Sequence, residues 1–514
     1  MQIPSIRKNI WLGTILSALA LVALFVLYTS GISRNPPGFY MDESATAYNA
    51  YMISRTGHAE FGPRFPLLIQ WYSGPSTSFV NPVTMYLMAL FFRFVPPSVV
   101  AARMFAAFWM FCASLLLGVL AKRISGRRSI GILVGGMALL TPWFIEVGRL
   151  VWDAHFVPMA VMLFLLAAYH AQTKETWSWR EVLMLAGSLG LLTYGYFAGR
   201  VLAPLFALGL LFFATTRPRL FGILKVWVVY TLTLVPTLIF SWRHPGTMAN
   251  RFELATYIKH DVPWRNSLAE FIRRYLEDQS VVGLLQTGHP LPRHHVIDAG
   301  GVFFFATFFL AMLGLLIVVV RHLREPWWRF TLYGLAASIM PGAITFEPFH
   351  ALRLLALPVF LLLLTVPALE WLLTEEWPSV QNARALSQVP WSVRFALLSV
   401  VMVLTIFEAA RFQRIYRHYG PERSVFFDAP YKEAFDAAVA QRQRPIYLRD
   451  GFYGPSYIDG LWYSAVEGKP RSDFVHVPVG STPPSGAIVL SSEQTCEKCD
   501  MIARSGIYLL YRQK

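Results

Sequence analysis

Apolar runs recur along this chain up to residue 408, and they limit its fold more than any other feature. The first run extends from Trp11 to Gly31, and ten more lie at roughly 99–121, 129–147, 155–172, 181–197, 200–215, 221–241, 300–320, 329–346, 353–373 and 391–408. A helix of about 20 apolar residues spans the hydrocarbon core of a bilayer. The sequence therefore predicts a mainly α-helical, polytopic membrane protein with about eleven transmembrane helices.

The composition agrees with this class and excludes two others. Of the 514 residues, 55% are hydrophobic and 15% are charged, which is too apolar for a soluble protein. The formal net charge is +15, but the basic residues are divided among short loops between the apolar runs. Such loops set membrane orientation, so we expect no nucleic-acid partner.

The basic residues also predict the orientation. Arg7 and Lys8 precede the first run, which places the N-terminus in the cytoplasm. The piece from Pro82 to Val95 contains Arg93 and, at ~1.5 Å per residue, covers only about 21 Å of a core of about 30 Å. We expect it to be an interfacial amphipathic helix within an external loop at about 32–98.

Two further hydrophilic regions fall outside the membrane in this topology. One is a loop at about 242–298, and the other is the tail at 410–514. Helix-like and strand-like segments alternate in the tail, which predicts a small extracytoplasmic α/β domain after a membrane domain at 1–409. Cys496 and Cys499 in this tail are expected to form a local disulfide.

Asp42 and Glu43 follow the first apolar run directly and are the predicted catalytic residues. A carboxylate at the centre of a bilayer costs about 2.5–3.5 kcal/mol on insertion scales, so this pair belongs at the water boundary. A solvated loop pair or a helix cap is the structural alternative. One carboxylate could remove the proton from an attacking hydroxyl if burial or its neighbour raises its pKa.

A second set of polar residues lies at the same predicted external ends of the helices. Guanidinium groups bind phosphate well because their planar fork contacts two oxygens at once. Arg149 and Asp153 are four residues apart, so a structural ion pair is the alternative there, and Arg200 could simply anchor a helix at the interface. The predicted substrate- and phosphate-binding residues are Arg149, Asp153, Arg200, Arg293, His350 and Arg353.

An ordered series of motifs resembles one family. The series comprises Phe39 to Glu43, Gly62 to Leu67, Leu140 through Asp153, Tyr194 to Pro204, and Pro341 through Arg353 to Pro358. In this order the motifs resemble the GT-C glycosyltransferases, specifically the bacterial relatives of protein O-mannosyltransferases and of the lipid A aminoarabinose transferase. The chain departs from the family at Asn81, where members often carry Lys or His.

The resemblance implies a GT-C helical bundle in a bacterial cytoplasmic (inner) membrane, with a large external first loop and Asp42 as the catalytic carboxylate. It also implies a glycosyltransferase of hexosyl or pentosyl type that moves a sugar from a polyprenyl-phosphate donor to an acceptor hydroxyl on a glycan, lipid or protein, with inversion. No cofactor is required, because arginines can neutralise the phosphate, although a divalent metal at Asp42 and Glu43 stays open. The alternatives are a transporter or flippase, or an outer-face ligase or polymerase, of lipid-linked saccharides.

Overall fold

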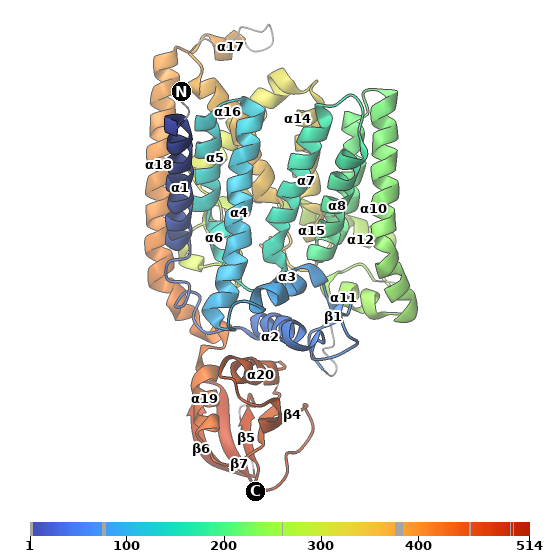
Figure 1. The fold of residues 1–514 in the computed structure, drawn as a ribbon, viewed down its shortest axis with the longest axis vertical. Coiled ribbons are helices and arrows are strands. Elements are labelled where there is room, and N and C mark those ends of the chain that lie inside the picture. The colour runs from blue at the N-terminus through green and yellow to red at the C-terminus, as the bar shows by residue number, and fades with distance from the viewer. Residues whose placement is uncertain are drawn as a thin grey trace.

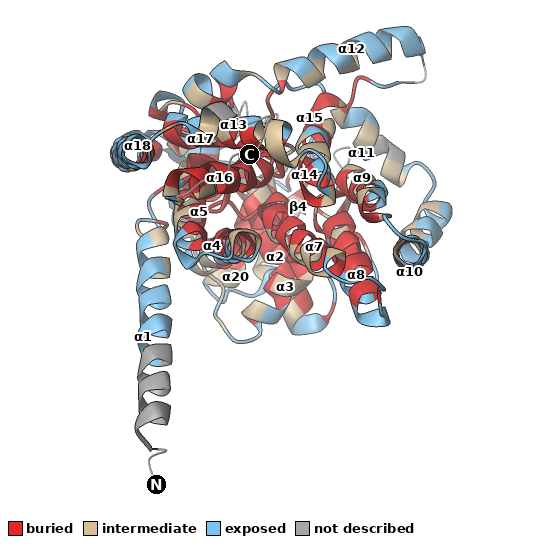
Figure 2. Cartoon of the chain, turned by 90° about the horizontal axis from the view of Figure 1, so that it is seen from above, coloured by how far each residue is buried: buried red, intermediate tan, exposed pale blue. Residues whose placement is uncertain are grey.

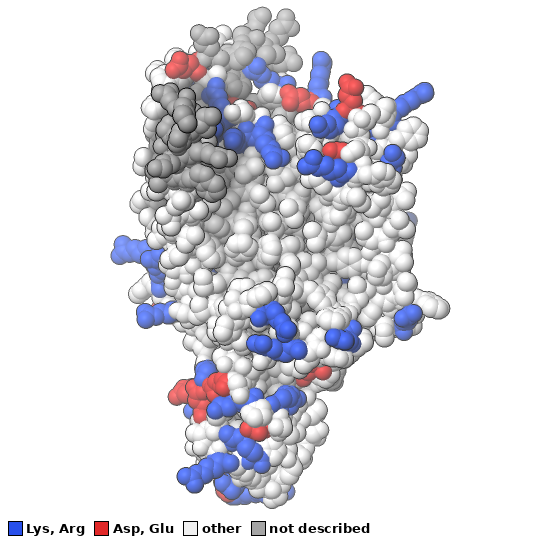
Figure 3. All heavy atoms as spheres, viewed as in Figure 1, with Lys and Arg blue, Asp and Glu red and all other residues white. Residues whose placement is uncertain are grey.

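The computed structural model describes residues 4–73, 79–259, 261–375, 384–451, 454–493, 495–496 and 498–514. Long helices run side by side in a bundle, and a small α/β domain made by the C-terminal residues lies against one end of it (Figure 1). We call this the catalytic end, because the predicted catalytic residues Asp42 and Glu43 lie there. Lys and Arg gather at both ends of the bundle on the face in Figure 3, with a broad uncharged band between them.

Each of the eleven predicted runs is helical. By length and composition, five helical stretches could cross a membrane, and shorter apolar helices pack with them. The bundle helices are α1 (Pro4–Tyr28), α4 (Val99–Ser125), α5 (Arg128–Leu140), α7 (Val157–Gln172), α8 (Trp179–Gly195), α9 (Gly199–Gly209), α10 (Arg217–Arg243), α13 (Phe305–Ile317), α14 (Pro326–Ala337), α16 (Leu357–Leu373) and α18 (Trp391–Tyr419). The predicted mainly α, polytopic membrane fold is therefore confirmed.

Two of the predicted runs are broken by proline. Thr141-Pro142 ends α5 and starts α6 (Pro142–Val147), and Pro341 lies in the separate short helix α15 (Met340–Ala343) after α14. Proline lacks an amide hydrogen and restricts the residue before it, so the helical hydrogen-bond ladder ends there. Both breaks end a helix before its full predicted length.

The loop after α1, predicted to be external and called here the first external loop, contains two helices that lie across the catalytic end (Figure 1). These are α2 (Met41–Thr56) and α3 (Pro82–Phe92), with a short strand pair β1 (Ile69–Gln70) and β2 (Phe79–Val80) between them. Helix α3 is the predicted interfacial segment. The second loop contains α11 (Thr247–Ala255) and α12 (Trp264–Glu277), and α12 lies apart from the bundle in Figure 2.

The C-terminal domain is a mixed five-stranded sheet with two helices. The strand order is β4-β3-β5-β7-β6, in which β3 pairs in parallel with β4 and β5, and β7 pairs antiparallel with β5 and β6. The elements are α19 (Ala429–Val439), β3 (Ile446–Arg449), α20 (Tyr457–Val466), β4 (Phe474–Val477), β5 (Ile488–Ser491), β6 (Cys499–Ser505) and β7 (Tyr508–Gln513). Cys496 and Cys499 form the expected disulfide beside β6.

A single hydrophobic core joins the first external loop to the C-terminal domain. Phe39, just before α2, stacks on Trp462 of α20 with ring centroids 5.4 Å apart, and both side chains are fully buried. Apolar residues of α2, α3, α19, α20 and the sheet belong to the same cluster. The apolar face of the loop is thus covered by the last part of the chain.

Glu43 is held in a buried ion pair at the start of α2. Arg103 of α4 donates to it at 2.9 Å, both side chains are fully buried, and Arg103 also donates to the carbonyl of Gly38. The backbone N–H groups of Tyr40 and Val151 donate to the same carboxylate, at 3.2 and 3.1 Å. This carboxylate fastens the loop to two bundle segments that are distant in sequence.

Replacing Arg103 with Met should destabilise the fold strongly. The substitution leaves the Glu43 carboxylate buried without its counter-charge, which costs about 3–5 kcal/mol. Unfolding in detergent followed by circular dichroism measures this loss. Arg93→Met is the control, because Arg93 is exposed at the end of α3. Equal stability of the two variants would contradict the role assigned to the ion pair.

Candidate functional site

Asp42 lies in the first turn of α2 at the catalytic end of the bundle. It is half-buried, and the hydroxyl of Tyr72 donates a hydrogen bond to its Oδ1. The pKa of the Tyr72 hydroxyl is raised well above its ordinary value, first by burial and then by the negative charge of Asp42. The two predicted catalytic carboxylates therefore differ, since Glu43 is enclosed by structural partners and Asp42 faces a tyrosine.

The C-terminal region supplies the other neighbours of Asp42. Asp428 accepts a hydrogen bond from the backbone N–H of Met41 at 3.2 Å and another from the Tyr508 hydroxyl at 2.7 Å. Burial raises the pKa of Asp428 and of Asp459, and the nearby charge of Asp42 raises both further. Two acidic groups of the tail thus stand close to the predicted base.

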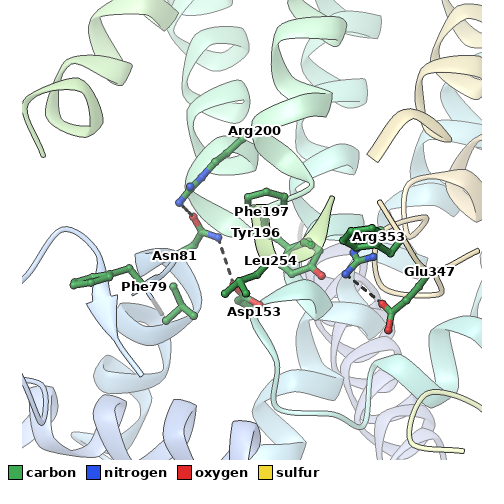
Figure 4. Close-up of a pocket in the computed structure, with 12 residues that line it drawn as sticks. Phe79, Asn81, Asp153, Tyr196, Phe197, Arg200, Leu254, Glu347 and Arg353 are labelled. Carbon is green, nitrogen blue, oxygen red and sulfur yellow. Dashed lines mark hydrogen bonds and ion pairs between the residues drawn. The ribbon is translucent and has the colours of Figure 1, made fainter. Parts of the chain in front are cut away.

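A polar pocket of about 320 Å³ opens at the same end (Figure 4). Asp153, Arg200 and Arg353, all predicted from the sequence, line it together with Asn81 and Glu347. Other parts of its wall are apolar or aromatic, and include Phe79, Tyr196, Phe197, Leu254 and Phe346. The structure therefore brings three of the predicted binding residues into one cavity.

Hydrogen bonds orient the polar groups inside this pocket. Arg200 donates from Nη2 to Oδ1 of Asn81 at 2.7 Å, and the Asn81 amide donates to Oδ2 of Asp153 at 3.4 Å. Across the pocket, Arg353 pairs with Glu347 at 3.3 Å (Figure 4). The side-chain amide of Asn81 thus links Asp153 and Arg200.

A chain of aromatic contacts connects the Asp42 region with the pocket wall. Tyr40 packs on Trp152, with centroids 6.3 Å apart, and Trp152 packs on His294 at 4.9 Å. Trp152 is the residue before Asp153, which lines the pocket. The guanidinium of Arg293 lies 3.6 Å from the ring centroid of Tyr40, so this predicted binding residue packs on the residue that precedes α2.

Arg149 points away from the pocket and binds backbone carbonyls. It is buried and donates to the carbonyls of Tyr28 at 2.9 Å and of Ser30 at 3.1 Å, just where α1 ends. Its guanidinium also lies over the ring of Tyr416 of α18. In this position Arg149 binds the end of α1 and contacts α18, which is a structural arrangement.

Three buried histidines form a cluster beside the pocket. Ring nitrogens of His289, His294 and His350 lie within 4.8 Å of one another, and the group could hold a metal ion. Burial lowers the pKa of all three, that of His289 to about 4. The imidazoles are therefore neutral near pH 7, which is the form that binds metal.

Hydrogen bonds already assign the protons in this cluster. Backbone N–H groups two residues further on donate to Nδ1 of His289 at 3.0 Å and of His350 at 3.3 Å. A neutral imidazole that accepts at Nδ1 carries its proton on Nε2. His289 can then donate to Nδ1 of His294 at 3.4 Å, and His350 to Glu347 at 3.1 Å. To bind a metal through Nε2, His289 and His350 would have to give up these protons.

The fold of nearly the whole chain is similar to that of solved protein structures. No family model and no curated protein sequence matches. The structure of ArnT from Cupriavidus metallidurans in the apo state is similar with a TM-score of 0.58, at 13% identity over 98% of each chain. ArnT bound to undecaprenyl phosphate gives 0.56, at 12% identity over 97% of each chain.

A second solved protein shares the fold over part of its length. Archaeal oligosaccharyltransferase AglB from Archaeoglobus fulgidus, in complex with an inhibitory peptide and a dolichol-phosphate, gives 0.51 at 13% identity. This likeness covers 89% of the present chain and 64% of AglB. ArnT and AglB are both GT-C proteins. The chain has the GT-C fold.

The polar groups at the catalytic end of this GT-C fold include several that the sequence did not single out. Tyr72 contacts Asp42, Asp428 contacts the residue before it, and Tyr508 contacts Asp428, but the three lie in unrelated segments and share no motif with Asp42. Asn81 was noted only as a departure from the family pattern. The sequence alone could not predict that these residues lie close together, because their proximity depends on how the C-terminal domain packs against the loop.

The histidine cluster predicts a measurable pH dependence of stability. The folded pKa of His289, about 4, is below the ordinary value of 6.5, so between these values the unfolded chain binds a proton that the folded chain does not. The stabilisation is complete above pH 6.5 and is lost as pH falls toward 4, up to about 3 kcal/mol.

His289→Asn removes the ionisable ring and keeps an acceptor for the backbone N–H. We expect its unfolding midpoint in detergent to fall less than that of the wild type between pH 6.5 and 4.5. His418→Asn, at an exposed position, is the control and should follow the wild type. If the unfolding midpoints of the wild type and His289→Asn fell equally with pH, burial would not keep this histidine neutral.

Proposed function

We propose that this chain is a membrane glycosyltransferase that moves a sugar from a polyprenyl-phosphate donor to an acceptor hydroxyl on the extracytoplasmic face. The observation that carries the proposal is the pairing, at one end of a GT-C bundle, of a half-buried carboxylate with a pocket lined by two arginines. The structures of ArnT with undecaprenyl phosphate and of AglB with a dolichol-phosphate support the lipid-phosphate class of ligand.

We assign phosphate binding and proton transfer to different residues of the site. Arg200 and Arg353 bind the donor phosphate and neutralise the charge that develops on it as the glycosidic bond breaks. Asp42 takes the proton from the acceptor hydroxyl as that oxygen attacks the anomeric carbon. A single displacement of this kind inverts the anomeric configuration, and the phosphate leaves on the lipid.

The surroundings of Asp42 suit a general base. Asp42 is half-buried, and the acidic side chains of Asp428 and Asp459 lie near it. A carboxylate held at such a boundary between protein and solvent can accept a proton from a bound hydroxyl group. The Tyr72 hydroxyl fixes its orientation by a hydrogen bond.

The volume of the pocket limits the size of the sugar phosphate that can bind in it. Its volume, about 320 Å³, is at the lower end of the roughly 300–1,000 Å³ of small-molecule pockets. A monosaccharide phosphate suits such a space, so we propose a single hexosyl or pentosyl unit. We also propose that the guanidinium groups supply the positive charge and that no metal is required.

Asp42→Asn should lower kcat about 10²–10⁴-fold, which is the range that general-base catalysis contributes. The assay follows transfer from a synthetic polyprenyl-phosphate sugar to the native acceptor extract in proteoliposomes, with mass spectrometry of the product. Asp261→Asn, at an exposed loop carboxylate, is the matched control and should keep full activity. Full activity of Asp42→Asn would remove the base assignment, and lipid translocation without transfer would favour a transporter.

Arg200→Gln and Arg353→Gln should each raise the KM for the donor. A hydrogen bond to a charged group contributes about 1.5–3 kcal/mol, equivalent to roughly 10–100-fold in binding. Arg243→Gln removes an exposed charge at the same end of the bundle and should have no such effect. Donor titrations run with and without EDTA check both parts of the proposal, because loss of activity in EDTA would show that a metal is needed. An unchanged KM in both pocket variants would place the phosphate elsewhere.

A further inference from the structure

An apolar groove of about 710 Å³ lies between α1, α4 and α5. The α1 side of the groove is formed by Leu21 and Leu24, both on the mostly exposed part of this helix that leans away from the bundle in Figure 2. The opposite side is formed by α4 and α5 and includes Leu115, Ile132 and Leu139. In a membrane-spanning chain, such a surface faces the acyl chains of the bilayer.

Glycines shape the floor of this groove. A Cβ on Gly118 of α4 would lie 2.6 Å from the carbonyl oxygen of Gly131 of α5, so the two helices meet backbone to backbone. Small residues allow this close approach between membrane helices. Gly136 also lines the groove, but a Cβ there would meet nothing within 4 Å. The helix backbones therefore form the bottom of the groove, and the space above Gly136 is open.

Two cations line the groove at one end. Lys122 lies in the last turn of α4, and Arg128 is the first residue of α5. Both are exposed, and neither forms a salt bridge with any residue that the structure describes. Because α4 starts at Val99 near the catalytic end and is 27 residues long, these cations stand roughly 40 Å from that end, at the other membrane boundary.

We propose that an anionic phospholipid binds in this groove, with its acyl chains along α1, α4 and α5 and its phosphate between Lys122 and Arg128. The apolar walls match the chains, and the unpaired cations match a headgroup with net negative charge. Basic pockets between membrane helices bind anionic headgroups in this way, at about 1 kcal/mol, or fivefold, per cation. A zwitterionic headgroup has no net charge and gains less from the same pair.

The charge side of the proposal can be tested by native mass spectrometry of the full chain. Protein is released from nanodiscs that contain equal amounts of phosphatidylglycerol and phosphatidylcholine, and the bound lipids are counted. The wild type should retain phosphatidylglycerol preferentially. The double variant K122Q/R128Q should weaken this retention by about 25-fold, at fivefold per cation. The matched double variant K174Q/R180Q removes two exposed cations from a neighbouring loop at the same end and should behave as the wild type.

The groove itself is tested by filling it. Gly136→Leu places a side chain in the open space and should reduce retention of both lipids. Gly187→Leu is the control, because Gly187 is also a helical glycine with nothing within 4 Å of its Cβ, but it is exposed on α8, away from the groove. Unchanged phosphatidylglycerol retention in K122Q/R128Q would overturn the proposal. A dimer that forms in place of the lipid complex and is lost in Gly136→Leu would also overturn it.

Discussion

The catalytic end of this protein depends on the buried ion pair between Glu43 and Arg103. Successive residues on a helix point about 100° apart. When Arg103 and the backbone N–H groups of Tyr40 and Val151 fix Glu43 inward, the side chain of Asp42 is directed elsewhere, toward Tyr72. Two carboxylates that are equivalent in the sequence thus take different positions, one buried and structural, the other half-buried beside polar groups.

The helices could be predicted from the sequence because apolar length alone identifies them. The breaks at Pro142 and Pro341 shorten two of them without removing any. Strand β6 could not be predicted, since residues 499–505 form a mostly exposed edge strand that lacks the apolar alternation of a half-buried one. Helix α18 extends beyond residue 409 because Phe412 and Tyr416 bury one face while arginines cover the other.

The site was predictable only in part, and the arginines show why. Arg149 and Arg200 both follow apolar runs at the external ends of helices, so the sequence treats them alike. The structure directs Arg200 into the pocket and Arg149 onto the carbonyls at the end of α1. That difference depends on which backbone groups lack partners nearby, and this is decided by tertiary packing. Clustering of His289, His294 and His350 has the same origin, because two segments that are distant in sequence must converge to form it.

The stacking of Phe39 on Trp462 has a consequence for synthesis of the protein. Trp462 lies in α20, so the apolar side of the first external loop is covered only after this helix has been made. Asp428, which accepts a hydrogen bond from the residue before Asp42, also comes late in the chain. During translation the bundle helices can enter the membrane while this apolar surface is still open. A ribosome that stops before α20 would leave an inserted bundle with an uncovered apolar loop, a form that proteases can recognise.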